Sequence, residues 1–280
     1  MISMETGKQA AQAPSSFPAA QHLRRAVLIA LVLMTACIAL TFPACQNTSE
    51  TPEAYVSPYD WAGLERTGDH LAYYEDGNLS SQMGVDVSSH QGPIDWQAVA
   101  GDGIDFAIIR VGNRGYTEGT LSVDEQFAQN IDGAEVAGLE IGAYFFSQAL
   151  TVEEAQEEAD LVLDQLAGRS IDLPIAYDHE SVTDPAGRAN LLTGGDLAAC
   201  ARAFCERLES AGYETMIYGN KQDIARFEGD TLNDRPRWLA EYDVAAPTAQ
   251  FDFAIWQYTN NGSIAGIDTP VDLDIRFLIE

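Results

Sequence analysis

The chain has 280 residues, of which 46% are hydrophobic, and this size allows one large domain or two small ones around a packed core. Its 43 acidic residues outnumber its 15 basic residues, which gives a formal net charge of −28. Because proteins bind phosphate backbones through clustered Lys and Arg, this balance argues against a nucleic-acid ligand and is typical of a well-solvated, self-repelling surface.

Residues 1–45 are expected to form an export or anchoring segment. Arg24 and Arg25 precede an apolar run over residues 26–44, which is just long enough to span a bilayer as a helix. Two outcomes stay open: a retained membrane anchor, or cleavage near a loosely lipobox-like site at Phe42-Pro43-Ala44-Cys45 or Met34-Thr35-Ala36-Cys37. Both place the rest of the chain outside the cytoplasmic membrane, in a bacterial cell envelope or secreted.

Residues 46–81 are polar, contain Pro52 and Pro58, and lack sustained periodicity, so we expect an extracytoplasmic linker with some local order. Its aromatic residues, Trp61 among them, could pack on the following domain. Further along, Cys200 and Cys205 fall in a helical pattern with a spacing that places them on different faces, so two buried free thiols are expected.

From residue 82 to the end, short apolar runs alternate with helical patterns. The runs are continuous and rich in β-formers, which is typical of strands buried on both faces. They cover residues 83–87, 106–111, 141–146, 174–178 and 215–218, with later strands expected at 237–240 and 254–258. Helices are expected at 95–100, 124–137, 151–166 and 196–211. This alternation over about 200 residues predicts an α/β fold with a parallel sheet, and a barrel rather than an open sheet.

Two acids stand at the end of one predicted strand, in Ile175-Ala176-Tyr177-Asp178-His179-Glu180. Strand side chains alternate, so Asp178 and Glu180 point to the same side, whereas His179 points away. Two adjacent carboxyl groups do not ionise independently, so the pair could supply a protonated acid and a charged stabiliser, as glycosidic bond cleavage requires. Taken alone, the motif also fits a solvated strand terminus with two unrelated acids.

Other strand ends are expected to bring further side chains to the same face, because sites in parallel α/β folds form at the carboxyl ends of strands. Asp86 ends the first strand. The aromatic and amide candidates for substrate binding are Tyr144, Tyr218, Trp238, Tyr242, Trp256 and Gln257. Acids walled by Tyr and Trp suit a groove for sugar rings, although core packing is the alternative for any one aromatic residue.

Several motifs, in order, resemble those of glycoside hydrolase family 25 lysozymes. They cover about residues 82–280, essentially the whole predicted folded part. The matching segments are Gly84-Val85-Asp86-Val87-Ser88-Ser89-His90-Gln91-Gly92 with Asp95-Trp96, Phe106–Val111, Asp124 with Phe127 and Asn130, Gly142–Phe146, Asp178-His179-Glu180, Trp238-Leu239-Ala240, Trp256-Gln257-Tyr258 and the closing Val271-Asp272.

The resemblance implies a modified β/α (TIM-like) barrel with a reduced helix count, acting as an N-acetylmuramidase on the β-1,4 bond between N-acetylmuramic acid and N-acetylglucosamine in peptidoglycan. By motif position, Glu180 corresponds to the general acid and Asp178 to the partner that stabilises the charged intermediate or orients the acetamido group. Asp86 and Asp272 correspond to the other two acids, with Asp274 as a rival for the second of these. Neither a metal nor a cofactor is implied.

The expected partner is therefore a peptidoglycan strand, with membrane contact only through the N-terminal segment, no nucleic acid, and a monomeric chain. Three alternatives stay open. The domain could bind the cell wall without catalysis, it could cleave another N-acetylated glycan such as chitin, or it could be a structural envelope lipoprotein.

Overall fold

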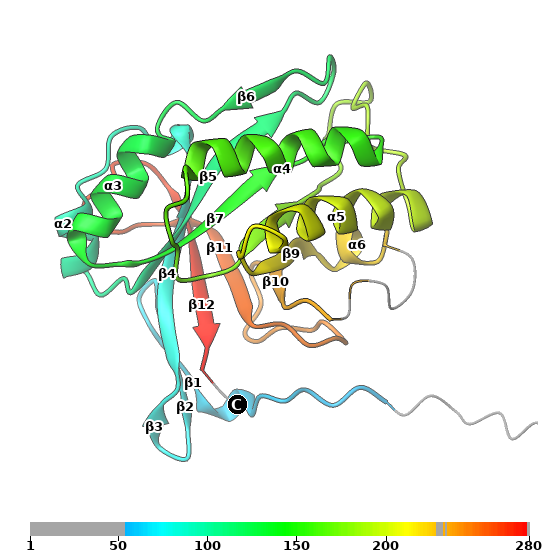
Figure 1. The fold of residues 1–280 in the computed structure, drawn as a ribbon. Helices are drawn as coiled ribbons and strands as arrows, with labels where there is room; N and C mark the ends of the chain where they lie inside the picture. The colour runs from blue at the N-terminus through cyan, green and yellow to red at the C-terminus, as the bar shows by residue number, and fades with distance from the viewer. Residues whose placement is uncertain (1–53, 228–231, 233, 279–280) are drawn as a thin grey trace, which may run out of the picture. The chain divides into compact units, whose positions relative to one another are not determined.

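Eight strands of the described chain form a closed barrel (Figure 1). Around the barrel their order is β4 (Ser81–Val87), β12 (Val271–Phe277), β11 (Ile255–Gly262), β10 (Arg237–Ala240), β9 (Thr215–Asn220), β8 (Ile175–Asp178), β7 (Glu140–Phe146) and β5 (Phe106–Arg114), and pairing of β4 with β5 closes the ring. All are parallel except β12, which is antiparallel to both neighbours. A short strand, β6 (Leu121–Val123), extends β5 as a hairpin. The predicted barrel is thus confirmed.

The computed structural model describes residues 54–227, 232 and 234–278, and all of these from Tyr55 onward belong to one compact unit, Tyr55–Glu280. The expected export segment, residues 1–45, and the first part of the expected linker lie outside the described residues. Among the described helices, none combines the length and the apolar character needed to cross a bilayer.

The helices of the described residues lie outside the barrel and are fewer than in a regular β/α barrel. They are α2 (Trp96–Gly101), α3 (Phe127–Ala137), α4 (Val152–Leu166), α5 (Gly194–Glu209) and the single turn α6 (Lys221–Ile224). Local sequence sets their ends: the Thr151 hydroxyl accepts a hydrogen bond from the Glu154 amide at 3.2 Å, and Gly138, with φ of 84°, ends α3. In the described chain β10 connects to β11, and β11 to β12, without a helix.

Apolar side chains fill two layers, inside the barrel and between barrel and helices. Alternation along each strand assigns the residues to these layers, so that on β8 Ala176 packs inside while Ile175 and Tyr177 pack outside. Both faces of the strands are therefore buried, which explains the continuous apolar runs. Cys200 and Cys205 are buried free thiols on α5, as predicted.

A glycine on β4 is required by close packing inside the barrel. A Cβ atom at Gly84 would lie 2.2 Å from the ring of Phe106, which is itself fully buried. We expect Gly84→Ala to lower the free energy of unfolding by about 1–3 kcal/mol, because a rigid ring must shift. Gly101→Ala, where nothing lies within 4 Å of the added atom, is the control and should change little. Chemical denaturation of both variants tests this, and equal stability would contradict the packing argument.

The described part of the expected linker is ordered structure that packs against the barrel. It contains the 3-10 turn η1 (Trp61–Gly63) and a three-stranded antiparallel sheet of β1 (Leu64–Thr67), β2 (His70–Glu75) and β3 (Asn78–Leu79). Tyr59 and Tyr73 are buried here, and the Tyr59 ring centroid lies 4.1 Å from that of Phe277 at the end of β12. The compact unit of the described chain thus begins at Tyr55, so residues 55–81 belong to it rather than forming a separate linker.

Candidate active site

A cavity of about 370 Å³ opens where the parallel strands end. Four carboxyl groups, aromatic rings and two amides line it: Asp86, Tyr144, Asp178, Glu180, Tyr218, Trp238, Tyr242, Gln257, Asn260 and Asp272. The structure therefore brings together all four acids singled out in the sequence and five of the six other candidate residues. Carboxyl ends of barrel strands are the usual place for an active site.

Strand register explains how distant acids meet. Asp178 is the last residue of β8, and Glu180 follows two residues later. Asp86 lies on β4 directly opposite Asp272 on β12. Because β12 runs antiparallel, its first residues, rather than its last, lie at the carboxyl end of the other strands. This reversal is what places Asp272 beside the other three acids.

The polar motif that follows β4 holds the backbone in place. The Ser88 hydroxyl accepts a hydrogen bond from the His90 amide, and the Gln91 side chain accepts one from the Ser88 amide at 2.9 Å. This closes a capping box on the 3-10 turn η2 (Ser89–Gln91). Arg110 then ties the turn to the barrel, because it donates to Asp124 at 2.8 Å and to the Ser89 hydroxyl at 3.1 Å.

Glu180 has the environment of a proton donor at neutral pH. Its side chain is partly exposed at the cavity, and burial, the charge of Asp223 and, more weakly, that of Asp272 raise its pKa to about 7. A carboxyl group with this pKa is substantially protonated near pH 7, whereas an ordinary glutamate is not.

The pKa values of the other three acids are also raised, so the four carboxyl groups of the cavity are not all ionised at the same time. Burial raises the pKa of Asp272 to about 6, and burial and neighbouring acids raise the pKa values of Asp86 and Asp178 well above their usual range. Arg110 acts in the opposite direction on Asp178. Like charges in one dry site repel, so these groups ionise one after another rather than together.

Gln257 connects several of these groups. Its amide nitrogen donates to Asp86 at 2.5 Å, and its amide oxygen accepts from the Tyr218 hydroxyl at 2.8 Å and from the Tyr242 hydroxyl. Its side chain is 2% exposed. The sequence analysis expects Gln257 to bind substrate directly. In the structure, its polar atoms already form hydrogen bonds with other protein groups.

Trp256, expected among the substrate-binding residues, does not line the cavity. It faces the outer layer, is fully buried, and donates its indole N–H to the Glu241 carbonyl at 2.8 Å. Neighbours on a strand point to opposite faces, so Gln257 turns inward where Trp256 turns outward. For the same reason His179 lies outside the cavity lining, and its ring stacks on Tyr177.

The rival acid Asp274 faces the barrel interior but lies deeper than Asp272. It is fully buried and accepts the Trp238 indole N–H at 2.7 Å, whereas Asp272 lines the cavity.

The sequence analysis did not identify two residues near the site. Asn260 on β11 lines the cavity, and the buried Asp223 on α6 acts on the charges of Asp178 and Glu180. No strand-end pattern points to either residue.

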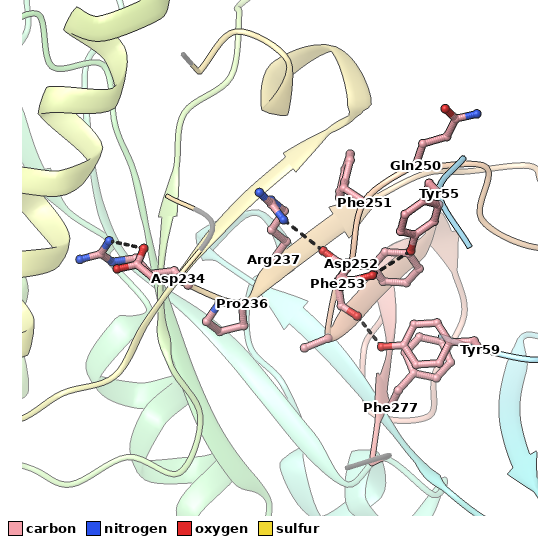
Figure 2. A pocket seen from close by; sticks show the side chains of 12 residues that line it. Tyr55, Tyr59, Asp234, Pro236, Arg237, Gln250, Phe251, Asp252, Phe253 and Phe277 are labelled. Atoms are coloured by element: carbon pink, nitrogen blue, oxygen red, sulfur yellow. Dashed lines mark hydrogen bonds and ion pairs between the residues drawn. The ribbon is translucent and has the colours of Figure 1, made fainter. Parts of the chain in front are cut away.

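A larger hollow, of about 740 Å³, lies at the other end of the barrel (Figure 2). It is bordered by Arg237 at the start of β10, Ala254 just before β11 and Phe277 at the end of β12. Among its lining residues, the Tyr55 hydroxyl donates a hydrogen bond to the Asp252 carboxylate at 3.1 Å. It shares no lining residue with the cavity that holds the four acids.

Comparison with known sequences gives lysozymes as relatives. The chain is 29% identical over 191 residues to the autolytic lysozyme of Clostridium acetobutylicum, covering 68% of this chain and 54% of that protein. It is 28% identical over 224 residues to lysozyme M1 of Streptomyces globisporus, covering 70% of this chain and 67% of that protein. The chain thus spans about half the length of the first of these relatives.

Solved structures show the same fold. The bacterial lysozyme from Streptomyces coelicolor matches with a TM-score of 0.60 and 27% identity, over 71% of this chain and 93% of that one. The spore cortex lytic enzyme SleM of Clostridium perfringens matches with a TM-score of 0.62 and 25% identity, over 72% and 69%. The family model for glycosyl hydrolases family 25 matches residues 85–267, more than half of the chain. The chain therefore belongs to glycosyl hydrolase family 25.

Proposed function

We propose that this protein is an N-acetylmuramidase, which hydrolyses the β-1,4 bond between N-acetylmuramic acid and N-acetylglucosamine in peptidoglycan. The observation that carries the proposal is the grouping of Asp178 and Glu180 with Asp86 and Asp272 around one aromatic-walled cavity at the carboxyl end of the barrel. Family membership, and relatives named lysozymes, support the same activity.

In the proposed mechanism Glu180 protonates the glycosidic oxygen as the bond breaks. Its partial exposure leaves it accessible to a bound glycan, and its raised pKa keeps the proton available. Asp178 is buried beside it and, when ionised, stabilises the positive charge that develops on the sugar or orients the acetamido group. In this mechanism Asp86 and Asp272 are the two other acids that contact the bound glycan.

The walls of the cavity are proposed to hold the sugar rings. Tyr144 and Tyr242 are partly exposed, whereas Tyr218 and Trp238 lie deeper and pack against each other with ring centroids 4.4 Å apart. Aromatic faces stack on the apolar faces of pyranose rings, and the surrounding carboxyl groups accept from sugar hydroxyls.

Mass spectrometry of the products tests the proposal. Purified sacculi and, separately, chitin are incubated with the protein, and the soluble fragments are reduced and sequenced. We expect muropeptides with N-acetylmuramic acid at the reducing end. Fragments ending in N-acetylglucosamine, release from chitin alone, or binding to sacculi without release would each reject a muramidase.

The activity should depend on pH in a direction set by Glu180. Its pKa of about 7 predicts that kcat/KM falls as pH rises through 7, because the donor proton is lost. On the acidic side, activity should fall as Asp178 becomes protonated. This loss should begin at a pH above the usual pKa range of carboxyl groups, because the pKa of Asp178 is also raised. Initial rates on sacculi between pH 4 and 9 test both limbs, and a rate that stays flat from pH 6 to 9 would contradict the role of Glu180.

We also propose that the chain acts outside the cytoplasmic membrane as a monomer, held by residues 1–45 either as a membrane anchor or as a lipoprotein. The proposed substrate, peptidoglycan, lies outside the cytoplasmic membrane, and this supports the proposed location of the protein. Fractionation of cells into membrane and secreted material, with size-exclusion chromatography of the purified protein, tests both.

A further inference from the structure

A further acid, Glu241, lies at the pole of the barrel that holds the cavity. It follows β10 directly and precedes Tyr242, which lines the cavity wall. The Glu241 side chain is 9% exposed and is not among the groups that line the cavity. It is thus placed to act on the site through its neighbours rather than through contact with a glycan.

The Glu241 carboxylate closes the loop that follows β10. One oxygen accepts from the Lys221 ammonium group at 2.5 Å and from the Thr248 hydroxyl at 2.5 Å, and the other accepts from the Thr248 amide at 2.8 Å. Lys221 also donates to the Thr248 hydroxyl. These three residues, which we call the clasp, join the start of α6 to both ends of the segment 241–248.

Backbone contacts hold the same residue from the side of β11. The Glu241 amide donates to the Gln257 carbonyl at 3.1 Å, and the Glu241 carbonyl accepts the Trp256 indole N–H at 2.8 Å. On the other side of Tyr242, Asp243 has a φ of 57°, a left-handed conformation that is uncommon outside glycine. Tyr242 therefore follows a residue whose polar groups are all engaged and precedes a residue in a restricted backbone conformation.

The clasp depends on the charge of Glu241. Burial opposes ionisation of this side chain, but hydrogen bonds from Lys221 and Thr248 outweigh burial and hold the pKa of Glu241 below its usual range. Hydrogen bonds to an ionised carboxylate are stronger than those to a neutral group. Glu241 thus stays charged and paired, in contrast to the four acids of the cavity, whose pKa values are raised.

We propose that Glu241, held by Lys221 and Thr248, is a positioning residue that fixes the Tyr242 ring as one wall of a sugar-binding subsite. Tyr242 is partly exposed at the cavity, and its hydroxyl donates to the Gln257 amide oxygen. That contact fixes the tip of the ring, and the clasp fixes the backbone that carries it. The inference rests on the proposed function for the nature of the ligand and adds the residues that orient one wall.

Kinetics of clasp variants test the inference. Glu241→Gln keeps the shape of the side chain but lacks the charge that pairs with Lys221, and Lys221→Met removes the cation. In both we expect KM for soluble peptidoglycan chains to rise by about 3- to 10-fold, the size of one aromatic contact, with kcat within about twofold of the parent value. Lys221→Arg keeps a cation with hydrogen-bond donors and should retain a near-parental KM.

The matched control is Glu140→Gln. Glu140 is also an ion-paired glutamate, bound to Arg276 at 2.7 Å, but it lies at the start of β7, at the opposite pole of the barrel. Its substitution should leave both KM and kcat unchanged. A rise in KM that is confined to the clasp variants is then specific to the wall that carries Tyr242.

A measurement without substrate reads the position of Tyr242 directly. The full chain is labelled with carbon-13 in its tyrosine rings, and Tyr242→Phe identifies the NMR signal of Tyr242. We expect this signal to shift or broaden in Glu241→Gln and in Lys221→Met, and to stay in place in Lys221→Arg and Glu140→Gln. Because the Lys221 side chain is 37% exposed, Lys221→Met can be read even if Glu241→Gln does not fold.

Three outcomes would overturn the inference: a Tyr242 signal that is unchanged in the clasp variants, a fall in kcat with KM unchanged, or an equal rise in KM in Glu140→Gln. The NMR measurement uses no peptidoglycan and is independent of the proposed activity. A parent protein that releases no muropeptides would reject the proposed function, and the Tyr242 signal would still decide whether the clasp positions the ring.

Discussion

Replacement of Glu180 by Gln is expected to lower the release of muropeptides from sacculi by at least about 100-fold, because the amide preserves the shape of the side chain but has no proton to give to the leaving oxygen. The thermal stability of the folded protein should not decrease. Glu180 carries a raised pKa because its ionised form is disfavoured in the cavity, so a neutral amide is compatible with the same site. Rates and thermal midpoints measured together at pH 6 test both parts.

The matched control is Glu75→Gln. Glu75 is an exposed residue of the small sheet of β1, β2 and β3, and it does not line the cavity. We expect its substitution to leave activity unchanged, so that any loss in Glu180→Gln is specific to the site. Near-parental lysis by Glu180→Gln would remove Glu180 from the mechanism, whatever the control shows.

Replacement of Arg114 by Met is expected to lower the free energy of unfolding by about 3–5 kcal/mol, because it leaves a buried carboxyl group without its counter-charge. Arg114 is 4% exposed and donates to the fully buried Glu158 at 2.8 Å, to the Glu154 carbonyl at 2.8 Å and to the Gly119 carbonyl at 2.9 Å. The other Glu158 oxygen accepts from Ser147 at 2.6 Å. This network joins β5 to α4.

The loss should grow with pH, and its sign follows from Glu158. Burial raises the pKa of this group from 4.5 to about 7 even with Arg114 present. Its folded state thus holds the proton more tightly than the unfolded state, and stability is lost as pH rises from about 4.5 through 7. Without Arg114 the folded pKa rises further, so the variant should continue to lose stability above pH 7.

Denaturation of parent and variant at pH 5.5 and pH 8 measures this difference. A second change, Glu158→Gln, removes the unpaired charge and should recover much of the loss at pH 8. Arg169→Met is the surface control, because Arg169 pairs with the exposed Asp132 and Glu135 and its loss should cost less than about 1 kcal/mol. An equal loss in Arg114→Met at both pH values would show that packing, rather than the buried charge, sets the effect.

The barrel and the central pair of acids were predictable because the signals are local. Strands buried on both faces read as continuous apolar runs, and alternation alone puts Asp178 and Glu180 on one side. The same alternation explains why Trp256 does not line the cavity, although the sequence analysis expected it to bind substrate. Adjacent strand residues cannot face the same side, so Trp256 and Gln257 could not both line the cavity.

Other features depend on contacts that no local pattern reports. Strand β12 alternates apolar and charged residues, a pattern typical of a half-exposed strand, yet Asp272 and Asp274 face the barrel interior while Leu273 and Ile275 face the outer layer. Asp223 approaches Glu180 only because α6 folds back after β9. The small sheet of β1, β2 and β3 is short and largely exposed, and its order comes from packing under the barrel.

The antiparallel direction of β12 also decides where the protein can be attached. The last described residues follow β12 away from the cavity, and the chain enters at Tyr55, whose hydroxyl meets Asp252 just ahead of β11 (Figure 1). Entry and exit therefore share one pole, and the acids occupy the opposite pole. A polymer bound at the acids therefore approaches the barrel from the pole opposite to both ends of the described chain.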